Sequence, residues 1–125
     1  MDYSEDKLTE TIIEAVIQVH RVLGPGFLES IYRRALVLEL AKHGLQVLTE
    51  KEVIVTYDGH EVGRHRLDML VEGGCIVELK TVEKLSSAHY AQVRSYLKAT
   101  GLAVALLVNF ATPKADYRRI SIQNP

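Results

Sequence analysis

The sequence has little cysteine, few large aromatic residues and no strong excess of either charge. Cys75 is its single cysteine, so the chain cannot close an internal disulfide or supply a four-thiolate metal site. It contains no tryptophan and only two phenylalanines, which argues against a base-stacking platform for single-stranded nucleic acid. Lysine and arginine number 15 against 16 acidic residues, and the resulting net charge of −1 excludes a strongly basic nucleic-acid scaffold. We therefore expect stability from packing in a reducing compartment and a cytoplasmic location.

Long apolar runs, internal repeats and low-complexity tracts are absent as well. The longest apolar run covers residues 102–108, far fewer than the roughly 20 residues that cross a bilayer. The first six residues include acidic residues and no basic one, unlike a signal peptide. Of the 125 residues, 47% are hydrophobic and 25% charged, as in ordinary soluble domains. This composition predicts one folded domain over residues 1–125 and no membrane partner.

Hydrophobic periodicity indicates an α/β fold. It predicts two helices, over residues 7–23 and 27–43, before any strand. Alternation then predicts strands, a third helix and further strands, giving a mixed central sheet flanked by helices in the order ααβββαβ(β). The expected later elements are strands over 45–55, 61–71 and 75–80, a helix over 88–100, a buried strand over 102–109 and a short edge strand over 118–122. In the second helix, the apolar face expected to meet the core consists of Leu28, Ile31, Ala35, Leu38 and Ala41.

The expected strand over residues 75–80 carries charge where burial normally excludes it. Because side chains alternate along a strand, Glu78 and Lys80 share one face. A three-residue loop at 72–74 would place Asp68 directly opposite Glu78, with Cβ atoms about 4.5 to 5.5 Å apart. Like charges at that distance need compensation, and hard oxygen ligands suit Mg²⁺ or Mn²⁺. The alternative is that these side chains are exposed and solvated.

Two groups of motifs resemble those of known nucleases. Asp68 followed by Glu78-Leu79-Lys80 resembles the active-site pattern of the PD-(D/E)XK nuclease superfamily. Gln92 and Tyr96, four residues apart on the next helix, resemble the additional motif of its RecB-like branch. Leu67 stands where the superfamily has proline, a position that contributes no ligand.

An upstream segment resembles a smaller branch of the same superfamily. Gly26-Phe27-Leu28-Glu29-Ser30-Ile31-Tyr32 matches the signature of the GxxExxY protein family. The whole likeness extends over about residues 20–119. It implies a restriction-endonuclease-like core and metal-dependent hydrolysis of phosphodiester bonds in DNA, with RNA as the less favoured substrate.

The resemblance also implies roles for individual residues. Lys80 would activate or orient the attacking water and stabilise charge in the transition state, and Gln92 would contact water or substrate near the metal. Tyr96 would contact substrate. Tyr32 is a further candidate substrate contact by its position, because it lies three residues after Glu29 on the same helix face. The metal ligands would be Glu29, Asp68, Glu78 and the main-chain carbonyl of Leu79.

Each of these roles has a simpler alternative. Glu29 could be a favourable carboxylate in a first helical turn, and Tyr32 could be a core residue. Gln92 could be solvated and Tyr96 half-buried. By position alone, Arg66 just before Asp68 and His89 at the start of the third helix are further candidates for phosphate contacts.

Basic residues cluster locally despite the neutral total, and a thin basic rim predicts weak, salt-sensitive binding of nucleic acid. We therefore expect a homodimer or a recruiting protein partner. Two competing hypotheses are a nucleic-acid-binding or assembly module without turnover, and a structural dimeric partner that associates through apolar residues of the first helix. The basic clusters are Arg33–Arg34, Arg64–Arg66, Lys80 with Lys84, Arg94 with Lys98, and Arg118–Arg119.

Overall fold

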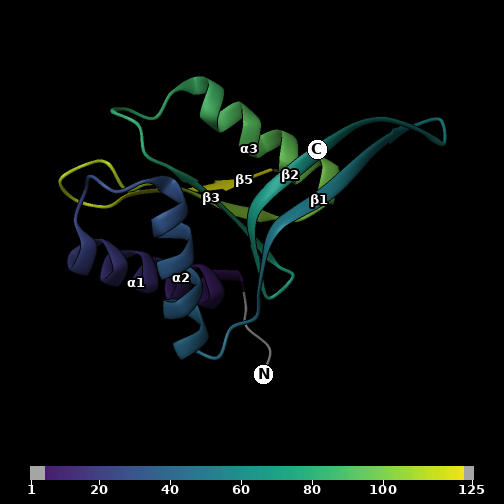
Figure 1. The fold of residues 1–125 in the computed structure, drawn as a ribbon. Coiled ribbons are helices and arrows are strands. Elements are labelled where there is room, and N and C mark those ends of the chain that lie inside the picture. Colours follow the sequence, from purple (N-terminus) through teal and green to yellow (C-terminus); the bar gives the residue numbers. More distant parts are fainter. Residues whose placement is uncertain (1–4, 123–125) are drawn as a thin grey trace.

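The chain folds as two helices, three strands, a third helix and two further strands, across the residues 5–122 that the computed structural model describes (Figure 1). The predicted order is confirmed, and the last short strand is present. The elements are α1 (Glu5–Leu23), α2 (Glu29–Lys42), β1 (Val47–Tyr57), β2 (His60–Val71), β3 (Cys75–Lys80), α3 (Ser87–Thr100), β4 (Val104–Asn109) and β5 (Asp116–Ser121).

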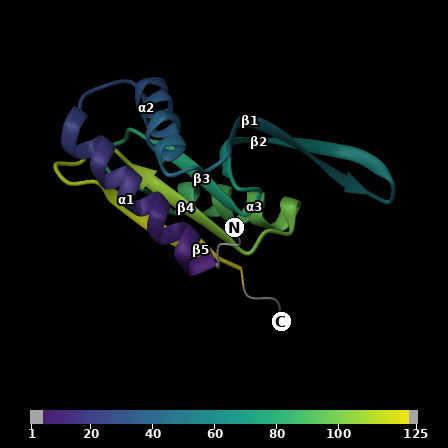
Figure 2. The same cartoon turned by 90° about the horizontal axis from the view of Figure 1, so that it is seen from below.

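The strands form one mixed sheet in the order β1-β2-β3-β4-β5. Neighbouring strands are antiparallel except β3 and β4, which are parallel because α3 provides the crossover between them. Helices α1 and α2 cover one face of the sheet, and α3 covers the other (Figure 2). Among the described helices, none is long and apolar enough to cross a membrane.

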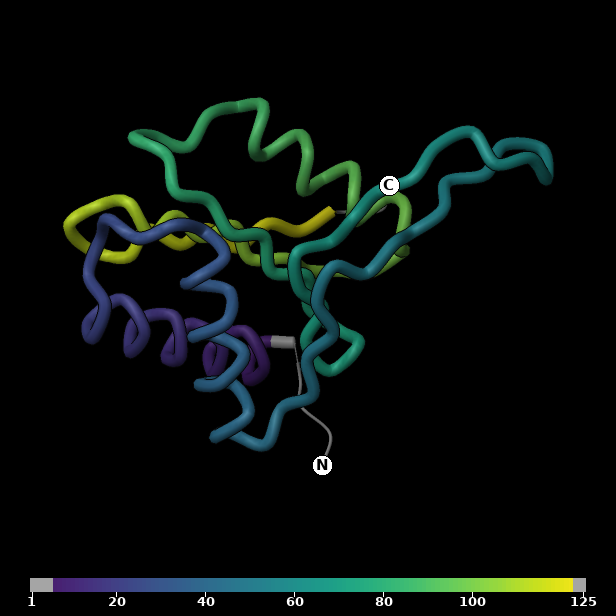
Figure 3. Tube along the Cα trace, in the orientation of Figure 1, coloured from purple at the N-terminus to yellow at the C-terminus, as the bar shows by residue number. Residues whose placement is uncertain are grey.

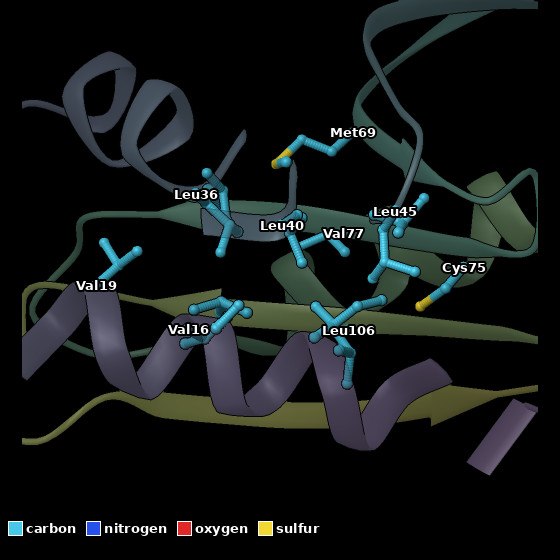
Figure 4. Packing of buried hydrophobic residues seen from close by; sticks show 14 of the residues in the cluster. Val16, Val19, Leu36, Leu40, Leu45, Met69, Cys75, Val77 and Leu106 are labelled. Carbon is cyan, nitrogen blue, oxygen red and sulfur yellow. The ribbon is translucent and has the colours of Figure 1, made fainter. Parts of the chain in front are cut away.

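The larger core lies between the sheet and the α1–α2 layer. Helix α1 contributes the face that its periodicity predicts, including Ile12, Val16 and Val19. Val77 of β3 and Leu106 of β4 meet them from the sheet, together with α2 (Figure 4). Side chains alternate along β3, so its even-numbered residues point to the opposite face of the sheet. Ile76 accordingly packs in the smaller core beneath α3.

The predicted core face of α2 is wrong by about one position. The helix buries Tyr32, Leu36 and Leu40, whereas Leu28 and Leu38 are 73% and 69% exposed. The helix begins at Glu29 rather than at residue 27, and Leu28 is its extended N-cap residue. Apolar residues occur on both sides of this helix, so helical spacing alone does not identify the buried side. The buried side of α2 is the one that carries Tyr32, whose ring stacks on Phe110 with ring centroids 4.4 Å apart.

Strands β1 and β2 form a long ribbon that leaves the sheet (Figure 3). β2 pairs with β3 only through residues 69–71, but with β1 along its whole length. Leu67 packs in the α3-side core, whereas Met69 packs in the opposite one, so the regular alternation of faces breaks at Asp68. Asp68 therefore lies where the ribbon turns away from the sheet.

Candidate active site

The fork between β2 and β3 places two carboxylates together. The last pair of the β2–β3 register is Met69 with Val77, so Asp68 and Glu78 lie opposite each other one step further along. The strands no longer pair at this step, and Asp68 Oδ2 instead accepts a hydrogen bond of 2.9 Å from the Leu79 backbone N–H. The predicted juxtaposition of Asp68 and Glu78 thus agrees with the register.

Glu78 is a buried carboxyl with an unusual environment. It is 4% exposed, and its Oε1 has no hydrogen-bond partner within the described part of the chain. Its Oε2 lies 3.6 Å from Lys80 Nζ. Burial raises the pKa of Glu78 to about 8, and the negative charge of Asp68 adds to this effect, while the Lys80 ammonium opposes it. A buried oxygen without a partner is costly unless another group binds it.

Helix α3 supplies the polar groups on the other side of Lys80. Lys80 Nζ donates a hydrogen bond of 2.9 Å to Gln92 Oε1. Tyr96 lies one turn further along α3, and its pKa is raised to about 12 by burial and by the charges of Glu78 and Asp68. Tyr96 therefore stays protonated at physiological pH. The spacing of the two α3 residues brings them to the carboxylates, as the sequence predicts.

Helix α2 brings a third carboxylate to the site. Burial raises the pKa of Glu29, and the negative charge of Asp68 adds to this increase. Lys80 and Arg33 act in the opposite direction on Glu29. Arg33 Nη1 also lies 3.5 Å from Asp68 Oδ1. Glu29 thus joins the carboxylates of the fork, a placement that a favourable first-turn position does not require.

The donor set is compatible with a hard divalent cation. Glu29 and Glu78 each interact electrostatically with Asp68, and one buried Glu78 oxygen has no other partner in the described residues. Between residues 5 and 122, no group of three His, Cys, Asp or Glu side chains already has the spacing of a metal site. The positive charges of Lys80 and Arg33 lie beside the carboxylates instead. Oxygen donors of this kind suit Mg²⁺ or Mn²⁺.

Tyr32 does not fit the substrate contact predicted from its position beside Glu29. Its side chain is 0% exposed. Its hydroxyl donates a hydrogen bond to the Gly24 carbonyl and accepts one from the Phe27 N–H. This arrangement favours the alternative, a core residue that holds the loop before α2.

Arg66 and His89 lie at the margin of the site. Arg66 is exposed and its Nη2 forms an ion pair of 3.1 Å with Glu50 Oε1. His89 Nδ1 accepts a hydrogen bond of 3.0 Å from the Ser86 N–H and completes the N-terminal cap of α3. The described contacts of His89 thus serve the helix end and do not join it to the carboxylates.

Three residues that sequence reasoning did not assign to the site contact it or support it. Arg33 is four residues after Glu29 on α2, a spacing that could have indicated it. No local sequence pattern indicated that Glu50 lies near the site. Asn109 is fully buried, and its side chain accepts hydrogen bonds from the Val82 and Ala111 N–H groups and donates to the Val82 carbonyl. It ties the segment after Lys80 to the end of β4.

Comparisons with known proteins identify the family of this chain. Residues 6–120 match the family model of the PD-(D/E)XK nuclease superfamily. No curated protein matches the sequence.

Two solved structures share the fold. One is described as the crystal structure of SSO0001, with 20% identity, a TM-score of 0.59, and coverage of 94% of this chain and 58% of that one. The other is an alkaline exonuclease (LHK-Exo) from Laribacter hongkongensis, with 16% identity, a TM-score of 0.55, and coverage of 98% and 73%. The chain thus spans little more than half the length of SSO0001. The fold is α/β and restriction-endonuclease-like.

Proposed function

We propose that this chain, which belongs to the PD-(D/E)XK nuclease superfamily, is a metal-dependent nuclease that hydrolyses phosphodiester bonds of DNA. The observation that carries the proposal is the buried Glu78 carboxylate opposite Asp68, with Lys80 beside it and one oxygen without a partner in the described residues. The motifs around Glu29 and Gln92 further suggest the GxxExxY family and the RecB-like branch. RNA is the less favoured substrate.

The carboxylates would hold Mg²⁺ or Mn²⁺ in the fork. We assign the ligands as Glu29, Asp68, Glu78 and the main-chain carbonyl of Leu79. A bound divalent ion supplies Lewis-acid polarisation of the phosphate and lowers the pKa of water. The hydrogen bond from the Leu79 N–H to Asp68 holds this backbone segment and the carboxylate in a fixed relation.

Lys80 and Gln92 would act together on the attacking water. The Lys80 side chain is 19% exposed and positively charged, so it can both orient a water molecule and stabilise negative charge that develops on phosphoryl oxygens. Gln92 Oε1 accepts a hydrogen bond from Lys80 Nζ and thereby fixes the direction of the ammonium. Tyr96, which keeps its proton, would contact the substrate as a neutral hydrogen-bond donor.

Binding of nucleic acid would be weak for an isolated copy. Arg64 and Arg66 of the β1–β2 ribbon are paired with carboxylates, so they add little net positive charge. We therefore propose that a homodimer or a recruiting protein strengthens binding. We also propose that residues 1–125 form one domain and that this domain acts in the cytoplasm. Arg66 could release Glu50 to reach a phosphate. His89 could contact a phosphate only if it left the N-terminal cap of α3.

Cleavage assays with matched variants test the proposal. Purified protein with Mg²⁺ or Mn²⁺ is incubated with linear, nicked, branched and single-stranded DNA, and with RNA of the same sequences. Asp68→Asn and Lys80→Ala should abolish cleavage, whereas Asp58→Asn, the same chemical change at the far turn of the ribbon, should leave it unchanged. Thermal melting checks that each variant folds.

The outcomes separate the competing hypotheses. Undiminished cleavage by Asp68→Asn or Lys80→Ala would contradict the proposed chemistry. Metal binding without cleavage of any substrate would instead favour a nucleic-acid-binding or assembly module that keeps the nuclease fold. Absence of metal binding would favour a structural partner.

A further inference from the structure

Arg33 of α2 lies between two carboxylates that belong to different strands. Its Nη1 is 3.5 Å from Asp68 Oδ1, and its Nη2 is 3.7 Å from Glu50 Oε1. The Arg33 and Asp68 side chains are 22% and 19% exposed, whereas that of Glu50 is 49% exposed. One guanidinium thus bridges a half-buried site carboxylate and a carboxylate nearer to solvent.

The backbone of Glu50 is arranged to make this bridge. Its neighbours Thr49 and Lys51 pair with Met69 and Leu67, so Glu50 lies opposite Asp68 across the ribbon. Glu50 itself has a φ of 53°, in the left-handed region that residues with a side chain rarely adopt. Such conformations persist where surrounding contacts hold them, and they are frequent at functional sites.

A second arginine holds Glu50 from the solvent side. Arg66 Nη2 lies 3.1 Å from Glu50 Oε1, the same oxygen that faces Arg33. Arg66 therefore holds the Glu50 carboxylate in a position where it can form a closer ion pair with Arg33. This contact needs no rearrangement of the ribbon.

The oxygens of Asp68 are both engaged. Oδ2 accepts the hydrogen bond from the Leu79 N–H, and Oδ1 faces Arg33. A divalent cation on Asp68 would have to share Oδ1 with the guanidinium or displace it, and the two positive charges would repel each other across a half-buried site, where solvent screening is weak. Arg33 therefore competes with a metal ion for the same carboxylate.

We propose that Arg33 is a positioning residue that neutralises Asp68 when no metal is bound and pairs with Glu50 when a metal is bound. The Arg33–Glu50 pair thereby sets the metal affinity of the fork. This inference rests on the proposed function, because it requires Asp68 to be a metal ligand. It adds two residues, Arg33 and Glu50, that would control loading without touching the reacting atoms.

A double-mutant cycle on metal binding tests the inference without any nuclease assay. Calorimetry measures the Kd for Mn²⁺ without nucleic acid, at fixed ionic strength, for the wild type, Arg33→Gln, Glu50→Gln and the double variant. Arg33→Gln should tighten binding by at least about fivefold, because it removes the competing cation, and Glu50→Gln should weaken binding by a similar factor. In the Arg33→Gln background, Glu50→Gln should have little effect.

Two control variants separate this coupling from a general change of charge. Arg34→Gln alters an exposed neighbour on α2, and Glu52→Gln alters an exposed carboxylate on β1 that pairs with Arg64. Both should change the Kd by less than about twofold. If Arg33→Gln does not fold, Arg33→Met, which keeps an apolar stem of similar length, provides the same comparison.

The possible failures are distinguishable. If Asp68→Asn abolishes Mn²⁺ binding but Arg33→Gln leaves the Kd unchanged or weakens it, the inference is overturned and the proposed function stands. If Glu50→Gln weakens binding equally with and without Arg33, Glu50 acts directly on the metal and the coupling is excluded. If the wild type binds no Mn²⁺, or Asp68→Asn binds it equally well, both proposals fail.

Discussion

Asp68 Oδ2 lies 2.9 Å from the Leu79 backbone nitrogen and accepts its hydrogen bond one step beyond the last β2–β3 pair. The side chain thus takes the place of a strand neighbour at the point where the two strands separate. The same carboxylate faces Arg33, and its charge adds to the effect of burial in raising the pKa values of Glu29 and Glu78. Asp68 therefore links the local stability of the fork to the chemistry proposed for it.

The two roles of Asp68 can be separated by comparing two substitutions. Asp68→Asn and Asp68→Ala both remove the charge, but asparagine keeps an oxygen that can accept the Leu79 N–H. We expect Asp68→Asn to be the more stable variant by about 1–2 kcal/mol, because alanine leaves a backbone donor without a partner. Urea unfolding with a chelator present measures this difference. Equal stability of the two variants would show that the hydrogen bond to Leu79 contributes little.

The raised pKa of Glu78 predicts a pH-dependent stability of the metal-free protein. The folded protein keeps the Glu78 proton up to a pKa of about 8, whereas the unfolded chain loses it near the ordinary glutamate pKa of 4.5. Between these values the folded state binds more protons, so the contribution of this group to stability is lost as pH rises from about 4.5 to 8. Glu78→Gln removes this loss. The free energy of unfolding of Glu78→Gln, relative to that of the wild type, should therefore increase by on the order of 2–4 kcal/mol as the pH rises from about 5 to about 9.

Chemical unfolding in chelator at several pH values checks this prediction. Glu83→Gln, at an exposed position before α3, is the control and should follow the wild type. A stability difference between Glu78→Gln and the wild type that stays constant with pH would contradict the raised pKa of Glu78.

Much of the site could be predicted because its residues follow local rules. Alternation along β3 puts Glu78 and Lys80 on one face, and the three-residue loop sets the register that brings Asp68 opposite Glu78. Helical spacing on α3 likewise brings Gln92 and Tyr96 to one side. These inferences need only the periods of strands and helices and a count across one turn.

The remaining features depend on tertiary contacts that no local pattern specifies. Helix α2 has apolar residues on two sides, and the structure buries the side of Leu36 rather than that of Leu38. The left-handed backbone of Glu50 occurs at a residue type that does not favour it. The pairing of Arg33 with Asp68 joins a helix to a strand 35 residues later. Such contacts are decided by how the layers pack.

Gln92 should affect the rate of cleavage more than the binding of substrate. Its Oε1 accepts the hydrogen bond from Lys80 Nζ, so Gln92→Ala would leave the ammonium free to move toward Glu78. We expect kcat to fall by about 10- to 100-fold with little change in KM, as for loss of a group that acts in the transition state. Gln18→Ala on α1 is the control. A raised KM with unchanged kcat would assign Gln92 to substrate binding instead.

Tyr32→Phe tests whether Tyr32 is a core residue or a substrate contact. The substitution keeps the ring on Phe110 but removes the hydroxyl that binds Gly24 and Phe27. We expect a loss of about 1–2 kcal/mol in the free energy of unfolding, because the partly buried Gly24 carbonyl and Phe27 N–H lose their partner. Affinity for DNA, measured by fluorescence anisotropy, should not change, and Tyr57→Phe on the exposed ribbon turn should alter neither quantity. Weaker DNA binding with unchanged stability would restore the substrate role.

Asn109 should matter both for stability and for the position of Lys80. Its buried side chain makes three hydrogen bonds, two to Val82 and one to Ala111. The Phe110 N–H also donates to the Lys80 carbonyl, so the end of β4 is joined to the end of β3 at Lys80 and to the segment beyond it at Val82. Asn109→Ala removes three bonds at once and leaves partly buried backbone groups of Val82 and Ala111 unpaired, which should cost about 2–4 kcal/mol.

Hydrogen exchange separates a local effect of Asn109→Ala from a global one. The Val82 and Ala111 amides should lose protection first, because their acceptor is the side-chain oxygen Oδ1 of Asn109. Amides of α1, which lies on the other side of the sheet from α3, should change only as far as global stability changes. Because the segment after Lys80 is then free to move, kcat should fall even at temperatures where the variant is fully folded. Unchanged protection of Val82 and Ala111 would contradict this assignment of Asn109.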